Sequence, residues 1–193
     1  MQHLTSWHET DIAPIVLWLK WRSNRIAIVT PGISGGGTER VATILANGYV
    51  KRGHEVSVIC CYYNDCEYEL NNAVEVLDVM TESRGVMGLA RRSVALRQLL
   101  RQVDPDVVLS FVAPDMVLAQ RSCAPTVQTL RNDPWHYDTS RSKRFLIEKA
   151  FSSAEKVVFQ TSASMQFYPD EIRKKGVVLP NPIETSRLPR WKG

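Results

Sequence analysis

Short apolar runs and amphipathic stretches alternate along the chain from Arg25 to Leu179. The short runs are rich in Val and Ile and end at turn-forming residues, which is typical of buried β-strands. The longer stretches between them repeat their apolar residues every three or four positions, as helices that pack on one face do. This alternation predicts an α/β fold, a single Rossmann-like domain with a mostly parallel sheet flanked by helices.

The strands and helices of this domain can be assigned from the same pattern. We expect strands at Arg25–Thr30, Glu55–Tyr62, Val74–Val79, Asp106–Phe111, Thr126–Leu130, Lys156–Gln160 and Gly176–Leu179. We expect helices at Glu39–Arg52, Leu89–Val103, Asp115–Arg121 and Ser140–Phe151, and a further helix that begins near Ser162. The continuous apolar run of the fourth strand indicates that it is buried on both faces.

The two ends of the chain differ from the segment between them. Residues 1–24 hold one short apolar stretch that contains Pro14, too short to span a bilayer and without the arrangement of a secretory signal. We expect a poorly ordered extension there, with a Trp-rich surface anchor as the alternative. Residues 25–183 form the predicted domain, and residues 184–193 are expected to be a tail or the start of an interdomain linker.

Composition narrows the class of protein. The chain has 193 residues, of which 44% are hydrophobic and 23% charged, as in a soluble globular domain. Its net charge of +4 suits anionic partners such as nucleotides or phospholipid head groups, or is simply a solvated basic surface. We expect no nucleic-acid partner, because the arginines are scattered and no nucleic-acid-binding motif is present.

The four cysteines argue against a metal site. None of them has the CxxC spacing or the nearby histidines of a zinc site, so we expect no bound metal and a reducing, cytoplasmic location. Cys60 and Cys61 are adjacent in a predicted strand and therefore point to opposite faces of the sheet. At least one of them is expected to be a small buried apolar residue.

A glycine-rich loop joins the first strand to the first helix, with the sequence Gly-Ile-Ser-Gly-Gly-Gly-Thr-Glu-Arg-Val from Gly32 to Val41. Such a loop lets backbone amides approach an anion, and the following helix adds partial positive charge. A dinucleotide-binding fingerprint would need glycine where Arg40 stands, and a P-loop would need lysine where Thr38 stands. The loop therefore indicates another kind of phosphate site, or a turn that only packs strand against helix.

The segment from Gly36 to Val41 is similar to the first loop of bacterial family-4-like glycosyltransferases of the GT-B fold. The resemblance continues at Pro105–Asp106, Ser110–Phe111, Arg131–Pro134, Val158–Thr161 and Leu179–Ile183, so it covers residues 25–183. It implies the N-terminal, acceptor-side half of an enzyme that transfers a sugar from a nucleotide sugar to a saccharide or lipid-linked acceptor. It further implies retention of configuration, no metal and no cofactor in this half.

The same resemblance implies a partner domain. Family enzymes hold most of the nucleotide sugar in a C-terminal Rossmann-like domain with a paired-glutamate motif, and these 193 residues contain no counterpart of it. The alternative function is a non-catalytic binding or regulatory module with a truncated GT-B fold. A second Rossmann-like segment further along the reading frame would favour the enzyme.

Ligands of an open parallel sheet bind outside the carboxyl ends of its strands, which here gathers the loops after Thr30, Phe111 and Leu130. We therefore expect donor and acceptor to be bound by Gly35, Gly36, Gly37, Thr38, Glu39, Arg40, Arg131 and Asn132. Asp133 is the candidate catalytic residue, which would orient an acceptor hydroxyl or act as a weak base.

Each of these residues also has a local explanation. Arg131 would merely pair with a surface carboxylate, and the Asn-Asp-Pro sequence that follows it forms turns readily. Glu39 suits the first turn of a helix whether or not a ligand is present. A lone histidine such as His136, beside two aromatic residues, more often has a structural role.

The predicted helix Leu89–Val103 is amphipathic and basic, and it carries Arg91, Arg92, Arg97 and Arg101. A solvent-exposed face is the commoner reason for such a pattern. The alternative is contact with anionic lipid, which would make the protein a peripheral one on the inner face of the membrane.

Overall fold

The computed structural model describes residues 24–63, 65, 67–79, 85–119, 124–137 and 140–181. Within them the chain forms one sheet of seven strands, all parallel, in the order β3-β2-β1-β4-β5-β6-β7. The strands are β1 (Arg25–Thr30), β2 (Glu55–Cys60), β3 (Val74–Asp78), β4 (Val107–Ser110), β5 (Thr126–Leu130), β6 (Lys156–Phe159) and β7 (Gly176–Val178). The expected N-terminal extension, apart from Asn24, and the expected C-terminal tail lie outside the described residues.

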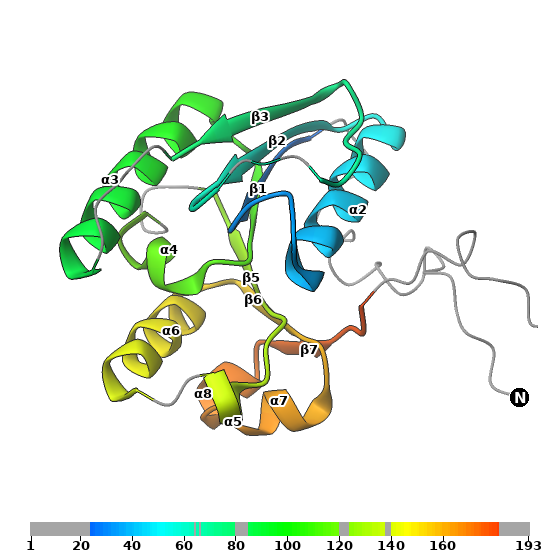
Figure 1. Ribbon diagram of the computed structural model, residues 1–193. Coiled ribbons are helices and arrows are strands. Elements are labelled where there is room, and N and C mark those ends of the chain that lie inside the picture. Colours follow the sequence, from blue (N-terminus) through cyan, green and yellow to red (C-terminus); the bar gives the residue numbers. More distant parts are fainter. Residues whose placement is uncertain are drawn as a thin grey trace, which may run out of the picture.

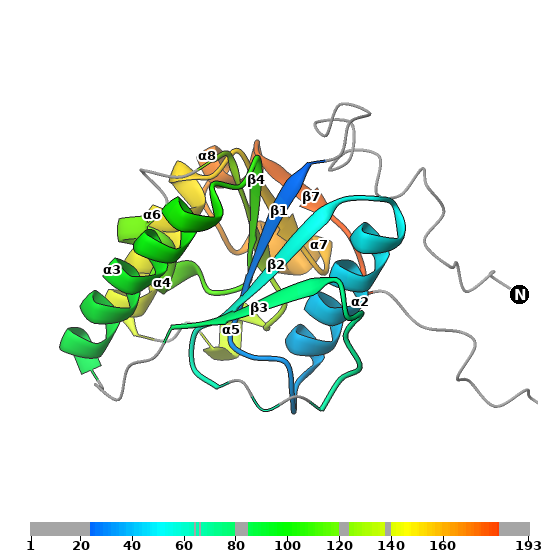
Figure 2. The same cartoon turned by 90° about the horizontal axis from the view of Figure 1, so that it is seen from above.

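Helices cover both faces of this sheet. They are α2 (Gly37–Lys51), α3 (Gly85–Val103), α4 (Ala113–Ala119), α5 (Pro134–Tyr137), α6 (Arg141–Ser153), α7 (Ser162–Gln166) and α8 (Asp170–Arg173). Helix α2 lies on one side of the sheet, and α3, α4 and α6 lie on the other (Figures 1 and 2). The predicted fold class is confirmed, and the described sheet is wholly parallel.

The helix pattern differs from the prediction in two places. Helix α5 was not expected, because a four-residue helix is too short to show a period. The helix expected near Ser162 is two short helices, α7 and α8, and Pro169 between them has no backbone N–H with which to continue a helix. Part of the expected helix Asp115–Arg121 falls outside the described residues.

Strand side chains alternate between two packed layers. Ile26 and Ile28 of β1 pack in the layer under α2, while Ala27 and Val29 pack in the layer under α3 and α4. Strand β4 divides its side chains between the same two layers, so the predicted burial of both faces is confirmed. A two-sided core of this kind fixes the strand register, because a slip by one residue would exchange the faces.

The adjacent cysteines follow the same alternation. Cys60 belongs to the layer under α2 and Cys61 to the opposite layer, and both are buried. Burial raises the pKa of the Cys61 thiol well above its ordinary value, so it stays protonated at neutral pH. Both cysteines are packing residues, which confirms the expectation for at least one of them.

A third cluster under α6 is built on aromatic rings. The Phe151 ring lies 6.1 Å from that of Phe159 and 5.2 Å from that of Tyr168, measured between centroids. Phe151 is completely buried. This cluster supports the β5 and β6 end of the sheet, where the candidate residues of the β5 loop begin.

Replacing Phe151 with alanine should lower the free energy of unfolding by about 3–5 kcal/mol, because it removes a buried ring and leaves a cavity. Urea unfolding monitored by circular dichroism measures this decrease in the free energy of unfolding. The control is Phe145→Ala on the same helix, whose side chain is exposed. The control should change the free energy of unfolding by no more than about 0.5 kcal/mol. Equal effects of the two substitutions would contradict the aromatic cluster.

Candidate functional site

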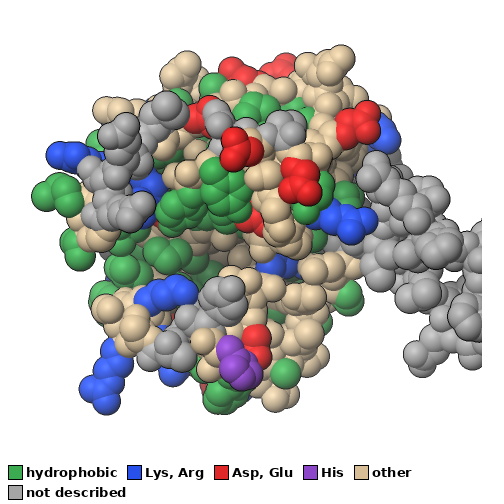
Figure 3. All heavy atoms as spheres, in the orientation of Figure 1, with side chains coloured by type: hydrophobic (Ala, Val, Ile, Leu, Met, Phe, Trp, Pro, Cys, Tyr) green, Lys and Arg blue, Asp and Glu red, His purple; other side chains and the backbone are tan. Residues whose placement is uncertain are grey.

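The candidate residues gather at one edge of the sheet. Strands β1, β4 and β5 are parallel neighbours, so the loops that follow them leave from the same edge. The glycine loop follows β1, and the segment Arg131–Asp133 follows β5. Figures 1 and 2 show the start of α2 and the short helix α5 on this same side of the molecule. Figure 3 views the edge face-on and shows a surface hollowed across its middle.

The amides of the glycine loop are partly occupied by the protein itself. Gly35, with a φ of 79°, donates its N–H to Oε2 of Glu67 at 2.8 Å. The N–H of Gly36 donates to the carbonyl oxygen of Ser34 at 3.0 Å. Two of the amides that the sequence suggests for an anion are therefore already used in this conformation.

The amides that remain are those of the first turn of α2. Gly36 is the N-cap of this helix, and its position provides no side-chain hydrogen bond to the first turn. Within the described part of the chain, the N–H groups of Gly37, Thr38 and Glu39 have no hydrogen-bond acceptor. The helix dipole is most positive at this end, so among the predicted residues the amides open to an anion are those of Gly37, Thr38 and Glu39.

The connection between β2 and β3 lies across the glycine loop. Backbone N–H groups of Glu67 and Tyr68 donate to the carbonyl oxygen of Ile33, at 3.4 and 3.3 Å. The Tyr68 hydroxyl donates to the carbonyl oxygen of Gly36 at 3.2 Å. Sequence reasoning missed Glu67, because it stands in a polar segment without periodicity and more than 30 residues beyond the loop that it contacts.

Glu39 points back over the loop instead of into solvent. It is 6% exposed, and its Oε1 accepts a hydrogen bond from the Tyr63 hydroxyl at 2.5 Å. Its other carboxylate oxygen lies so close to Gly36 that a Cβ on that glycine would overlap it. Glu39 therefore joins the start of α2 to the residues that follow β2, whereas Arg40 beside it is exposed.

Arg131 has a positive charge that no carboxylate balances within the described residues. One guanidinium nitrogen donates to the carbonyl oxygen of Leu179 at 3.1 Å and to Oδ1 of Asn181 at 2.9 Å. Its Nε is buried and finds no acceptor in the part of the chain that the structure describes. Burial lowers the pKa of Arg131 to about 10, so the group is still charged at neutral pH. The described contacts do not include the surface ion pair that was the local explanation for this residue.

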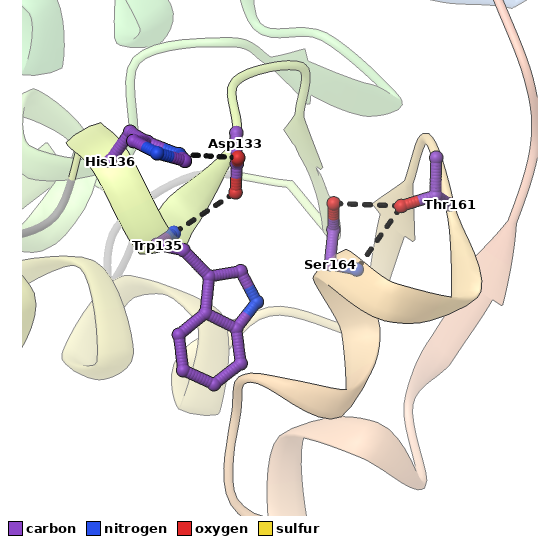
Figure 4. A network of polar contacts seen from close by, with 5 residues as sticks. All are labelled: Asp133, Trp135, His136, Thr161 and Ser164. Carbon is purple, nitrogen blue, oxygen red and sulfur yellow. Dashed lines mark hydrogen bonds and ion pairs between the residues drawn. The ribbon is translucent and has the colours of Figure 1, made fainter.

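Asn132 and Asp133 are both exposed, and the contacts of Asp133 are local. Its Oδ1 accepts the backbone N–H of Trp135 at 3.1 Å, and its Oδ2 lies 2.7 Å from Nδ1 of His136 (Figure 4). These two contacts start helix α5, which accounts for a helix that the sequence pattern does not reveal. They lower the pKa of Asp133, first through the hydrogen bond with His136. Asp133 is therefore a weak base, and its catalytic role stays a prediction.

Two tyrosines also stand at this edge, and the sequence did not single them out. The second strand was expected to run to Tyr62, but β2 ends at Cys60. Tyr62 and Tyr63 therefore lie in the loop beyond the carboxyl end of β2, where they are 52% and 39% exposed. Figure 3 shows hydrophobic and acidic side chains together on the upper half of this face.

Two further properties of the described residues bear on the class of site. They contain no cluster of three or more metal-ligating side chains. None of their helices combines the length and the hydropathy that crossing a lipid bilayer requires.

Removing the imidazole by His136→Ala should raise the titration midpoint of Asp133 part of the way toward the ordinary value of about 3.9, since the Trp135 N–H still bonds to it. Carboxyl carbon-13 NMR measures both midpoints. Because the folded-state pKa is lowered, the stabilisation from this carboxylate is complete above its unfolded pKa and is lost as pH falls through the folded value. A midpoint that does not move in the variant would show that the contact is absent in solution.

The chain is similar to known proteins in its sequence and in its fold. Residues 35–187 match the sequence model of Glycosyltransferase Family 4. No curated protein sequence gives a significant match. Among solved structures, a glycosyltransferase from Rickettsia africae is similar, with 16% sequence identity and a TM-score of 0.58 over 88% of this chain and 47% of that one.

Two other solved structures show how widely this architecture is shared. Anabaena HepE, in complex with UDP and glucose, has 16% identity and a TM-score of 0.58 over 84% of this chain and 46% of its own. The UDP-N-acetylglucosamine 2-epimerase from Rickettsia bellii has 9% identity and a TM-score of 0.61, over 83% of this chain and 45% of its own. At these identities the likeness establishes the fold, and this chain spans about half the length of each protein.

The family match begins within the glycine loop, at Gly35, and includes the segment after β5. The seven-stranded parallel sheet is that of one half of a GT-B enzyme. Since the match covers well over half of its residues, the chain belongs to Glycosyltransferase Family 4.

Proposed function

We propose that this chain is the acceptor-side half of a glycosyltransferase that moves a sugar from a nucleotide-sugar donor to a saccharide or lipid-linked acceptor. Membership of the family supports a transferase. The observation that carries the proposal is the Arg131 guanidinium, partly buried and without a carboxylate partner among the described residues, at the same edge of the sheet as the open amides of α2.

These two features suit a diphosphate. A guanidinium presents a planar fork of donors to phosphate oxygens, and a helix N-terminus adds N–H groups and partial positive charge. Both stabilise the negative charge that develops on the departing nucleoside diphosphate as the sugar is transferred. The reaction then depends on positioning the acceptor hydroxyl near the donor sugar, for which no metal and no cofactor is needed in this half.

The exposed residues after β5 suit the acceptor. The Asn132 amide both donates and accepts hydrogen bonds, which matches sugar hydroxyls. Because the pKa of Asp133 is lowered, its carboxylate would accept a hydrogen bond from an acceptor hydroxyl and orient it, with little tendency to take the proton. Retention of configuration belongs to the same proposal.

A C-terminal Rossmann-like domain would hold the nucleoside and most of the donor sugar. The similar solved structures are about twice as long as this chain, which supports a second half of comparable size. Donor and acceptor would then meet between the two halves, at the carboxyl edge of the sheet.

One observation favours the second candidate function, a non-catalytic binding or regulatory module. The Glu67 carboxylate already occupies the N–H of Gly35, as an anionic ligand would. A module that no longer binds a diphosphate would retain such an internal contact. The two candidates differ in whether an anion can displace Glu67.

Two substitutions should change anion affinity in opposite directions. Glu67→Ala frees the Gly35 N–H and removes a negative charge, so the affinity for UDP and for pyrophosphate should rise about threefold to tenfold. Arg131→Gln removes the cation and should lower both affinities about tenfold or more. Isothermal titration of the 193-residue chain at low salt measures both changes.

The matched control is Arg144→Gln, because Arg144 pairs with Glu148 on α6 and should not contribute to anion binding. Its affinity for UDP should equal that of the unmodified chain. If neither UDP nor pyrophosphate binds at millimolar concentration, even with Glu67→Ala, the proposed diphosphate site on this half is rejected and the non-catalytic module is favoured.

Helix α3 supports a second proposal, a cytoplasmic location with peripheral contact to the inner face of an anionic membrane. Val86, Met87 and Val94 are exposed, with exposed fractions of 86%, 62% and 51%. Arg91, Arg97 and Arg101 are exposed on the same helix. Exposed apolar and basic residues on one helix are the combination that binds the lipid interface.

The basic face is smaller than the sequence indicated. Arg92 was counted with the other arginines, but its side chain is 13% exposed and its Nε lies 2.8 Å from Oδ1 of the buried Asp115. Its charge is therefore balanced inside the protein. The proposed lipid contact therefore rests on Arg97 and Arg101, which are both exposed.

At low salt, the chain should float with vesicles that contain phosphatidylglycerol and should not float with neutral phosphatidylcholine vesicles. Each basic residue near an anionic membrane contributes about 1 kcal/mol to binding. The double variant Arg97→Gln with Arg101→Gln should therefore reduce flotation at least threefold. The double variant Arg141→Gln with Lys149→Gln on α6 makes the same charge change and should float normally. Flotation that is absent at low salt, or that is independent of these arginines, would contradict the membrane contact.

A further inference from the structure

Tyr62 and Tyr63 form an aromatic ledge beside the glycine loop. Both residues follow β2, and their backbone N–H groups share the carbonyl oxygen of Pro31 at 2.9 and 3.3 Å. Since Pro31 directly follows β1, these hydrogen bonds fix the ledge to the start of the glycine loop. The ledge therefore stands at the carboxyl edge of the sheet, where the ligands of such folds bind.

The Tyr62 ring is held from two directions. Its hydroxyl donates to Oδ2 of Asp115 at 2.5 Å, and Asp115 is completely buried. The guanidinium of Arg92 lies 4.6 Å from the ring centroid and covers one face of the ring. Burial, followed by the charge and hydrogen bond of Asp115, raises the pKa of Tyr62, so its hydroxyl stays a donor to that carboxylate.

The Tyr63 ring is held in a similar way by other residues. Its hydroxyl donates to Oε1 of Glu39 at 2.5 Å. The ring lies against Gly32, where a Cβ would overlap it and would come within 2.7 Å of the Tyr63 carbonyl oxygen. Only glycine at position 32 allows the ring to lie so close to the loop.

The two tyrosines share one consequence of these contacts. Each hydroxyl hydrogen is taken by a buried carboxylate. Arg92 covers one face of the Tyr62 ring, and one edge of the Tyr63 ring lies against Gly32. What the two residues offer to a ligand is the exposed carbon surface of their rings. Because the rings are already held in place, a ligand that stacks on them does not have to immobilise them.

The charge around the ledge selects the kind of ligand. Of the three carboxylates that contact the tyrosines or the adjoining loop, Glu39 and Glu67 accept hydrogen bonds from neutral donors, whereas Asp115 is paired with Arg92. These carboxylates disfavour a phosphate placed directly against the tyrosine rings. The ledge suits a neutral ring with a face of C–H groups and a rim of hydroxyls.

We propose that Tyr62 and Tyr63 form a stacking site for a pyranose ring of an uncharged acceptor saccharide. This inference rests on the proposed function, because it names the acceptor class of the same edge. It adds a subsite at the β2 end of the edge, distinct from Arg131 and next to the start of α2, where Tyr63 bonds to Glu39.

The test is NMR of the 193-residue chain with methyl α-glucopyranoside, methyl α-galactopyranoside and methyl N-acetylglucosaminide as probes. At least one glycoside should receive saturation from the protein on its ring C–H protons and should shift the signals of Tyr62 and Tyr63. The measurement on the unmodified chain locates the site without relying on any variant.

Variants then separate the rings from their hydroxyls. Tyr62→Leu with Tyr63→Leu removes the ring faces and should weaken binding about tenfold, given the usual worth of an aromatic contact. Tyr62→Phe with Tyr63→Phe keeps the rings and should bind within about threefold of the unmodified chain, although it removes both hydroxyls. Phe145→Leu, at an exposed aromatic residue on α6, is the control and should have no effect.

The outcomes of these measurements decide between the sugar-stacking site and the transferase proposal. Glycosides that shift only distant signals, or that bind the double leucine variant normally, would exclude the ledge as a sugar subsite. Tyrosine signals that shift with UDP but not with pyrophosphate would assign it to a nucleobase. A chain that binds UDP through Arg131 but no glycoside rejects the ledge alone. A chain that binds glycosides at the tyrosines but no nucleotide rejects the transferase proposal and keeps the ledge.

Discussion

The parallel hydrogen bonding of β2, β1, β4 and β5 is the constraint on which the rest of the structure depends. Parallel neighbours can be joined only by crossover connections, so all seven described strands end at the same edge of the sheet. The two-sided core under α2 and α3 holds the register of these strands. Residues separated by more than 90 positions in the chain, from Gly36 to Arg131, are therefore brought to one surface without any direct bond between them.

The two ends of this edge carry charges of opposite sign. Around β1 and β2 the carboxylates of Glu39, Glu67 and Asp115 each have a donor, so that side is acidic and internally satisfied. After β5, the Arg131 guanidinium has only neutral acceptors among the described residues. The side around β1 and β2 therefore suits an uncharged ring, and the Arg131 guanidinium suits phosphate oxygens.

The sequence predicts the sheet well because its strands are buried on both faces and leave continuous apolar runs that few other structures produce. It predicts the site only to the level of the loops. Helix α5 depends on a single side chain, Asp133, and is too short to have a period. The contact of Glu67 with Gly35 depends on the path of the loop between β2 and β3. Arg92 turns inward because it pairs with Asp115 of helix α4. Local sequence patterns do not reveal such pairs of residues that are distant in the chain. The spacing of Arg92 therefore predicts a place on the basic surface that the structure does not give it.

The uncapped start of α2 has a consequence for stability. A serine or aspartate at the N-cap contributes about 1 kcal/mol to a helix of this kind, yet a Cβ at position 36 would overlap a carboxylate oxygen of Glu39. A side chain there would push this carboxylate aside and disturb its hydrogen bond with Tyr63. The same crowding that keeps the first turn weak also keeps its N–H groups open to an incoming ligand. A sequence with a capping residue at position 36 would have a more stable helix α2, but its first N–H groups would no longer be available to a ligand. Selection for helix stability therefore works against ligand binding at this helix end.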